Sequence, residues 1–186
     1  MITLGIDLSL SSPALCLYNG QGFNLENCEF YFLTSSSKFL YVHPKLHGEM
    51  FPEYDTQSER YNNIAQWIVD IAKQFKVQSV FMEDYSFASV GRVFQIAENG
   101  GVCKHQLWKN RIEYKTIPPT VIKKFATGKG NADKQKIQEH FIEETNFDIK
   151  QALSMTEKQW NPSSDLIDAY YICKYGVENG NDAIPG

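Results

Sequence analysis

The sequence has few of the residues that build disulfide frameworks or structural zinc sites. Its 186 residues include only four cysteines, Cys16, Cys28, Cys103 and Cys173, and no C-x-x-C pair. Zinc ribbons and thioredoxin-like redox motifs both need such pairs, so both classes are excluded. Widely spaced cysteines within apolar stretches are typical of small core residues in a reducing compartment.

Long apolar runs are also missing. A membrane-spanning helix needs a run of about 18 apolar residues, and the sequence has none. Residues 1–7 lack the basic-then-apolar layout of a secretory signal. We therefore expect a cytoplasmic protein with no membrane partner. Because 42% of the residues are hydrophobic and 22% are charged, we expect one globular domain over residues 1–186.

Positive charge is scarce overall but is concentrated in one segment. The chain has 18 Lys and Arg residues against 22 Asp and Glu residues, and its net charge of −4 argues against a nucleic-acid partner. Nine of the basic residues lie between Lys104 and Lys136, beside only two acids, so this basic segment carries +7 and the remainder −11. A basic face on an acidic body is a footprint of phosphate binding, although solvated helix faces would give the same counts.

Hydrophobic periodicity predicts an α/β fold. Three early strands with short turns indicate an antiparallel meander, and the strand–helix alternation that follows indicates parallel strands. We therefore expect a five-stranded mixed sheet with helices on both faces, and an irregular insertion at about residues 35–58. The expected strands are 2–8, 14–19, 28–34, 77–83 and 112–117, and the expected helices are 59–76, 91–109, 119–126, 133–144 and 165–175.

Local signals predict where some of the helices begin and end. Asp133 is a good N-cap for the helix that follows it. Ser163 or Ser164 is expected to cap the last helix, and Gly176 is expected to end it.

Four carboxylates occupy positions that suit metal chemistry. Asp7 and Glu83 end two predicted strands, and Asp165 and Asp168 share one face at the start of the last helix. An acid at the end of an apolar strand is costly unless a cation or a donor meets it. Mg²⁺ prefers such oxygen ligands, and two ions about 4 Å apart can clamp the oxygens of phosphodiester hydrolysis. On spacing alone, helix capping and salt bridging explain these acids equally well.

Five blocks of sequence resemble the RuvC-type Holliday junction resolvases of the RNase H-like (retroviral integrase) superfamily. The blocks cover nearly the whole chain in matching order and spacing. They are "LGIDLSLSSPALCLYN" from Leu4, "VFMEDYSF" from Val80, "GRVFQIAENGGV" from Gly91, "TVIKKFATGKGNADKQKIQ" from Thr120 and "SSDLIDAYYI" from Ser163.

The resemblance implies an RNase H-like fold and a crossover junction endodeoxyribonuclease. Its acidic quartet, Asp7, Glu83, Asp165 and Asp168, would bind two Mg²⁺ ions, with Mn²⁺ as a substitute. One ion would activate water and the other would stabilise the leaving 3′ oxygen, which gives nicks with 5′-phosphate ends. The family acts as a homodimer, so two sites would nick a four-way junction symmetrically.

The resemblance also implies a DNA-contacting surface. Lysine side chains and glycine backbone N–H groups of the basic segment would approach phosphates. Aromatic side chains just after the second acid would stack on bases, although core packing is the alternative for them. The residues implied are Tyr85, Phe87, Arg92, Lys123, Gly128, Lys129, Gly130 and Lys134.

Several alternatives remain open at this point. The stretches 38–54 and 147–160 depart from the family pattern, which leaves the substrate preference open. With its richness in Asn, Lys, Tyr and Phe, the chain fits a phage-type member. A nuclease for flaps or RNA–DNA hybrids and a catalytically silent branched-DNA binding module are the other interpretations. A sugar-kinase or actin-like phosphotransferase would need a second such domain.

Overall fold

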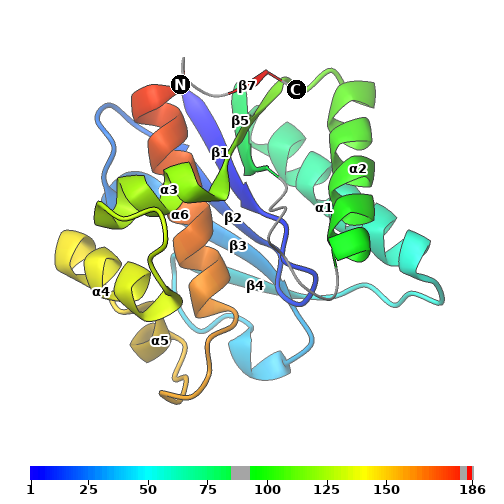
Figure 1. Ribbon diagram of the computed structural model, residues 1–186. Coiled ribbons are helices and arrows are strands. Elements are labelled where there is room, and N and C mark those ends of the chain that lie inside the picture. Colours follow the sequence, from blue (N-terminus) through cyan, green and yellow to red (C-terminus); the bar gives the residue numbers. More distant parts are fainter. Residues whose placement is uncertain (85–92, 181–183, 186) are drawn as a thin grey trace.

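A mixed β-sheet runs through the centre of the protein (Figure 1). The computed structural model describes residues 1–84, 93–180 and 184–185. Its strands are β1 (Ile2–Asp7), β2 (Ala14–Asn19), β3 (Cys28–Thr34), β4 (Leu46–Met50), β5 (Ser79–Glu83), β6 (Tyr114–Ile117) and β7 (Ile184–Pro185). Its α-helices are α1 (Gln57–Gln74), α2 (Val93–Lys109), α3 (Pro119–Thr127), α4 (Lys134–Thr145), α5 (Ile149–Ala152) and α6 (Ser163–Asn179), with 3-10 turns at Leu25–Asn27 and Ser37–Phe39.

The strand order is β4-β3-β2-β1-β5-β6-β7. As predicted, β1, β2 and β3 form an antiparallel meander, and β5 and β6 continue the sheet in parallel with β1. The predicted count of five strands is wrong. The sheet has β4 in addition, parallel to β3 and inside the stretch expected to be irregular, and the two-residue β7 beside β6.

The sequence pattern did not predict β4 because its residues do not alternate. In "LHGEM", Leu46 and Gly48 are buried, and the glycine contributes no hydrophobic signal. A Cβ on Gly48 would lie 2.4 Å from the Phe39 carbonyl oxygen, so a larger residue does not fit there. The strand therefore owes its place to backbone pairing with β3 and to close packing.

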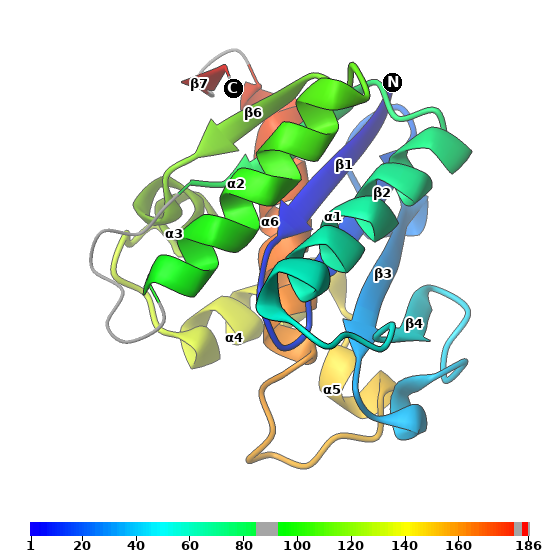
Figure 2. The same ribbon diagram turned by 90° about the vertical axis from the view of Figure 1, so that its right-hand side faces the viewer.

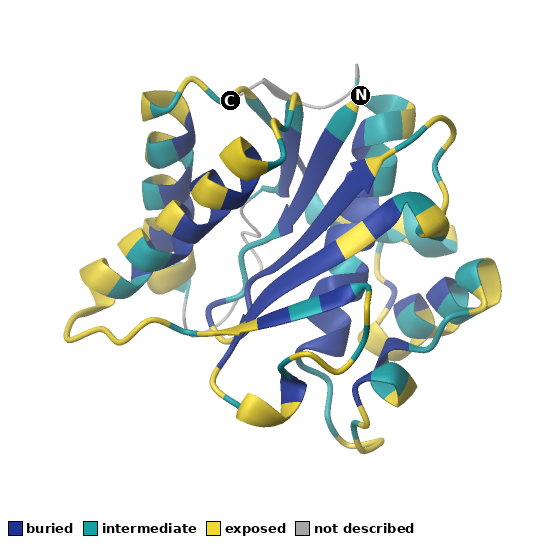
Figure 3. Cartoon of the chain, turned by 180° about the vertical axis from the view of Figure 1, so that it is seen from behind, coloured by how far each residue is buried: buried dark blue, intermediate teal, exposed yellow. Residues whose placement is uncertain are grey.

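Helices cover both faces of the sheet, as predicted. Helices α1 and α2 pack side by side on one face, and α3, α4 and α6 lie on the other (Figure 2). Alternation divides the strand side chains between them: Leu4 and Ile6 join the core under α1, whereas Phe30 and Phe32 join the core under α6. The central strands are consequently buried along most of their length (Figure 3). Within the described residues, no helix combines the length and hydropathy needed to cross a membrane.

The ends of the helices confirm one sequence signal and correct two others. Asp133 caps α4 as predicted, because its carboxylate accepts a hydrogen bond of 2.9 Å from the Lys136 N–H. The predicted serine cap of α6 is wrong: Ser163 and Ser164 lie inside the helix, and Pro162 occupies the N-cap position. The helix also continues past Gly176, where a Cβ would lie 2.2 Å from the Phe81 ring, so this glycine makes room for a neighbour instead of ending the helix.

The same kind of close approach joins α6 to β1. A Cβ on Gly5 would lie 2.4 Å from the Ala169 carbonyl oxygen and 2.5 Å from the Cys173 nitrogen. Glycine is the residue that permits such a backbone approach. The contact brings the first turns of α6 beside the carboxyl end of β1.

Candidate active site

Strand alternation directs two of the predicted acids to the same face of the sheet. Gly5 and Phe81 face α6, so Asp7 and Glu83, two residues further along β1 and β5, face α6 as well. The two strands are parallel and pair Ile6 with Met82, so the acids are neighbours at the edge where both strands end. Adjacent strands are about 4.8 Å apart.

Helix α6 brings the other two acids to this edge. Ala169 contacts Gly5; Asp165 lies about one turn nearer the start of the helix, and Asp168 lies one residue nearer. One turn of helix rises about 5.4 Å and two strand residues span about 6.7 Å, so Asp165 reaches the level of Asp7, and Asp168 lies between that level and the level of Gly5. Asp165 is only 4% exposed, and the other three acids are partly buried.

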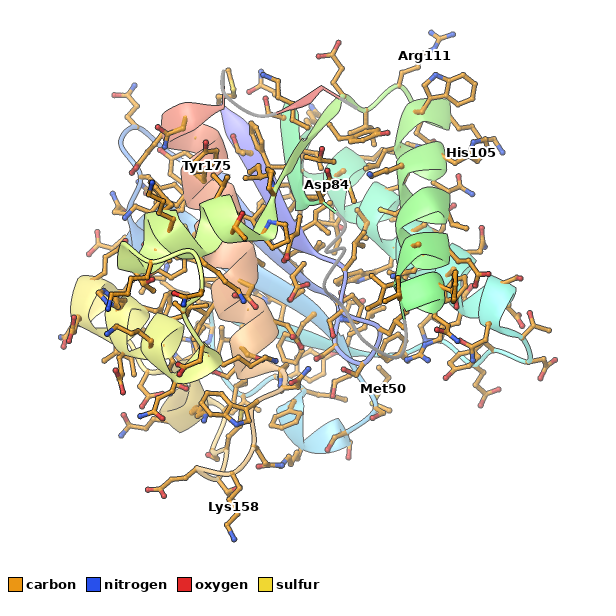
Figure 4. All side chains as sticks on the ribbon, in the orientation of Figure 1. Met50, Asp84, His105, Arg111, Lys158 and Tyr175 are labelled. Atoms are coloured by element: carbon orange, nitrogen blue, oxygen red, sulfur yellow. The ribbon has the colours of Figure 1, made fainter. Side chains whose placement is uncertain are left out.

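The residue after Glu83 does not join this group. Asp84, labelled in Figure 4, forms an ion pair of 3.6 Å with Lys104 of α2. Of these two neighbouring acids, Glu83 is therefore the one on the α6 side of the sheet.

The four acids interact electrostatically. Burial raises the pKa of Asp7 well above its usual value, and repulsion from Asp165, Asp168 and Glu83 raises it further. Burial, followed by the charges of Glu83 and Asp165, raises the pKa of Asp168 to about 7. The quartet therefore holds more negative charge than this edge accommodates without cations.

Two lysines of the basic segment partly offset that charge. Burial raises the pKa of Glu83 to about 7, and the positive charge of Lys123 opposes the rise. Lys134 has the same opposing effect on the pKa values of Asp7, Asp165 and Asp168. Both lysines thus lie near the acids.

Asp165 is held by groups that the sequence analysis did not assign to the site. Its Oδ2 accepts a hydrogen bond from the Ser12 hydroxyl and another, of 2.6 Å, from Asn161 Nδ2. Burial raises the pKa of Asp165, and the Ser12 hydrogen bond opposes the rise. The sequence does contain a signal for Asn161, because it stands four residues before Asp165, but that spacing alone does not separate it from other polar residues.

The four carboxylates are ligands of the chemical type that a hard divalent cation prefers. Mg²⁺ takes oxygen ligands, and four carboxylates that repel one another are such ligands. Among the described residues, however, no three Asp, Glu, His or Cys side chains converge closely enough to hold a metal ion as they stand. The residues fit the metal by type and by charge, whereas ligation requires their side chains to turn toward a common point.

The glycines and Lys129 lie in the turn that joins α3 to α4. Gly128 has a φ of 76° and ends α3, and its N–H already donates to the Lys124 carbonyl. A Cβ on Gly130 would lie 3.2 Å from the Thr120 carbonyl oxygen. Lys129 itself is exposed. DNA contact by this turn therefore stays a prediction, and it depends on the lysine side chain more than on the Gly128 N–H.

Tyr85, Phe87 and Arg92 lie outside the described residues. Their roles stay predictions.

Fold and site together define the class of protein. A mixed sheet in this order, flanked by helices and carrying acids at its carboxyl edge, has the RNase H-like fold. The structure of Thermus thermophilus RuvC is similar over all of both chains, with a TM-score of 0.62 and 17% identity. The structure of the same protein in complex with a Holliday junction substrate has a TM-score of 0.64 and 16% identity, and the match covers 100% of this chain and 99% of that one. The structure of Fowlpox virus resolvase bound to Holliday junction DNA has a TM-score of 0.51 and 10% identity, and the match covers 96% of this chain and 97% of that one.

The chain belongs to the RuvC family. The profile described as crossover junction endodeoxyribonuclease RuvC matches residues 47–159. That range contains Glu83 and the basic segment, while Asp7, Asp165 and Asp168 lie outside it and are joined to it by the fold. No curated protein matches the chain. The phage-type assignment stays a prediction.

Removing one carboxylate should stabilise the metal-free protein above neutral pH. Folded Asp168 has a pKa of about 7, whereas an aspartate in an unfolded chain has one of about 4. The native state therefore keeps a proton that the unfolded state releases, and this carboxyl lowers stability progressively as the pH rises from about 4 to about 7. Asp168→Asn should raise the free energy of unfolding by about 2 kcal/mol at pH 8 and by less than about 0.5 kcal/mol at pH 4.5.

Urea unfolding in the presence of EDTA at the two pH values measures this difference. Asp70→Asn, which changes an exposed acid of α1, is the matched control. An equal effect of Asp168→Asn at both pH values would contradict the electrostatic account.

Proposed function

We propose that this chain is a Mg²⁺-dependent, structure-selective DNA endonuclease that resolves four-way junctions as a homodimer. The observation that carries the proposal is the gathering of four interacting carboxylates from β1, β5 and α6, beside the lysines of α3 and α4. In a member of the RuvC family, this arrangement corresponds to a phosphodiesterase site.

The chain's own residues would divide the work at this edge. Asp7 and Glu83 stand on the paired backbones of β1 and β5, so their backbone positions are fixed, and their side chains would turn to offer oxygen ligands. Two bound Mg²⁺ ions, or Mn²⁺ in their place, would supply an activated water and stabilise the leaving 3′ oxygen, which yields nicks with 5′-phosphate ends. Lys123 and Lys134 supply positive charge beside the acids, where negative charge develops on a phosphate under attack.

The basic segment would guide the DNA backbone to the site. Helices α3 and α4 lie on the α6 side of the sheet (Figure 1), and Lys134 at the start of α4 donates a hydrogen bond to Ser164 of α6, so the end of the connecting turn lies beside the first turn of α6. Exposed lysines in such a position neutralise phosphates and release counterions. The overall charge of −4 is compatible with DNA binding because the positive charge is gathered where the phosphate is needed.

Helix α2 offers the surface for a second copy of the chain. Phe94 and Trp108 are 80% and 70% exposed, and they lie on one stripe of the helix together with Gly101. Among the described residues, nothing lies within 4 Å of a Cβ placed on Gly101, so another helix has room to approach. Large exposed apolar side chains on one stripe mark an interaction surface. A twofold pairing through α2 would place two acidic sites on one symmetric junction.

Cleavage of a labelled four-way junction tests the nuclease proposal. Wild-type protein with Mg²⁺ or Mn²⁺ should give paired nicks with 5′-phosphate ends that ligase seals. Asp7→Asn removes one ligand charge and should slow cleavage by about 100- to 1,000-fold or more, in the range for the loss of one charge-stabilising group. Junction binding by the variant should stay within about threefold of wild type, as measured by gel shift.

Linear duplex, flap and RNA–DNA hybrid substrates serve as controls. If the protein cuts a flap or a hybrid faster than the junction, that substrate would replace the four-way junction in the proposed function. Junction binding without cleavage by the wild type under all metal conditions would identify a silent binding module instead.

The salt dependence of junction binding tests the basic segment. Lys129→Ala and Lys134→Ala should each weaken binding and reduce the slope of log K against log salt concentration by about 0.9 for each phosphate that the variant no longer neutralises. Lys73→Ala, on α1 across the sheet, is the control and should leave the slope unchanged. An unchanged slope for Lys129→Ala would argue against contact between that side chain and phosphate.

Charge placed on the α2 stripe tests the dimer. Phe94→Glu and Trp108→Glu change exposed side chains, so the variants should fold, but they should sediment as monomers where the wild type sediments as a dimer. Tyr41→Glu alters an aromatic that is 95% exposed and lies away from α2, and it should remain dimeric. Monomeric wild-type protein at micromolar concentrations would contradict the proposal for this surface.

A further inference from the structure

Asn161 lies at the centre of a hydrogen-bond network beside the acidic site. It stands between the stretch 147–160, which departs from the family's sequence pattern, and the start of α6. Its Nδ2 donates to Asp165 Oδ2 at 2.6 Å and lies 3.1 Å from Ser12 Oγ and 3.3 Å from Ser11 Oγ. One side chain thus connects the turn after β1 with the first turn of α6.

The orientation of the Asn161 amide follows from the chemistry of its neighbours. Lys134 Nζ has only protons to donate, so the Ser164 hydroxyl accepts its hydrogen bond of 3.2 Å. That hydroxyl directs its own proton to Asn161 Oδ1, 3.4 Å away. With Oδ1 occupied as an acceptor, Nδ2 faces Asp165. The lysine of α4 is therefore linked to the carboxylate of α6 through two neutral side chains.

This arrangement restrains Asp165 at one oxygen. Oδ2 receives the Ser12 hydroxyl and the Asn161 amide, and the residue is almost fully buried. A carboxylate that binds a cation through one oxygen is commonly oriented by hydrogen bonds to the other, and the loss of such a partner costs about 10- to 100-fold in metal affinity or activity. An aspartate at position 161 would keep the shape but would oppose Asp165 with a second acceptor.

We propose that Asn161 is a positioning residue that orients Asp165 for divalent-metal binding and connects it to Lys134. The proposal rests on the nuclease function proposed above and goes beyond it by assigning a role to a residue outside the acidic quartet. It also gives a function to the chain just before α6, at the end of a stretch in which the sequence departs from its family.

Metal binding in the absence of DNA tests this role separately from catalysis. Thermal unfolding is followed across Mg²⁺ and Mn²⁺ titrations for the wild type, Asn161→Ala and Asn161→Asp. The metal concentration that gives half of the rise in Tm should increase about tenfold or more in both variants, within the range expected when such a partner is removed. Single-turnover junction cleavage should slow by about 10- to 100-fold, while the Kd for the junction should stay within about threefold of wild type.

Gln159→Ala is the matched control. This neighbouring amide bonds Lys38 and the Thr156 N–H instead of an acid, so its metal midpoint and cleavage rate should equal those of the wild type. Asn161→Asp, which is nearly isosteric, separates the loss of a donor from a loss of packing, and the unfolding of each variant without metal checks its fold.

The outcomes are distinguishable. Wild-type metal midpoints in both Asn161 variants would overturn the positioning role. Metal binding by the wild type without cleavage of any branched DNA would overturn the nuclease function, while the Asn161 titrations would still report on Asp165. If the Tm of the wild type does not change with either Mg²⁺ or Mn²⁺, both proposals would be overturned.

Discussion

The direct packing of α6 against β1 is the contact on which the acidic site depends. At Gly5 the helix and the strand approach so closely that a single Cβ would clash with the helix backbone. This approach sets the first turns of α6 level with the end of β1, and strand alternation turns Asp7 and Glu83 toward them. A larger side chain at position 5 would separate the helix from the sheet and would move Asp165 and Asp168 away from their partners.

The acidic edge is electrostatically unfavourable by itself, and its surroundings show how the chain accommodates it. Burial and mutual repulsion raise the pKa values of the carboxyl groups, and Lys123 and Lys134 oppose the rise. Around Asp165, hydroxyl and amide donors add further support. Such a balance leaves the site in need of positive charge, which cations would supply during the proposed reaction. The lysines of α3 and α4 offset the charge of the acids, and in the proposed function they would also neutralise an approaching phosphate backbone.

Much of the fold was predictable because local signals are strong along the central strands. The observed bounds of β2 and β3 equal the predicted ones, and Asp133 caps α4 as expected. The errors arose where the structural role of a residue depends on a neighbour that is distant in the sequence. Gly176 suggests the end of a helix locally, but it makes room for Phe81, and β4 exists because its backbone pairs with β3. Asn161 was not found because its role depends on Ser12, which is distant in the sequence, and on the contact of Lys134 with Ser164.

The sequence by itself determined most of the element types, the family resemblance and the four candidate acids, because periodicity and motif spacing are local properties of the chain. It also determined that positive charge is gathered in one segment. Only the tertiary structure decided that the acids share one edge, that Lys134 is linked to Asp165 through Ser164 and Asn161, and that Phe94 and Trp108 remain exposed on α2. The physical reason is that distances between side chains on different elements follow from backbone packing, above all from the approach of α6 to β1 at Gly5.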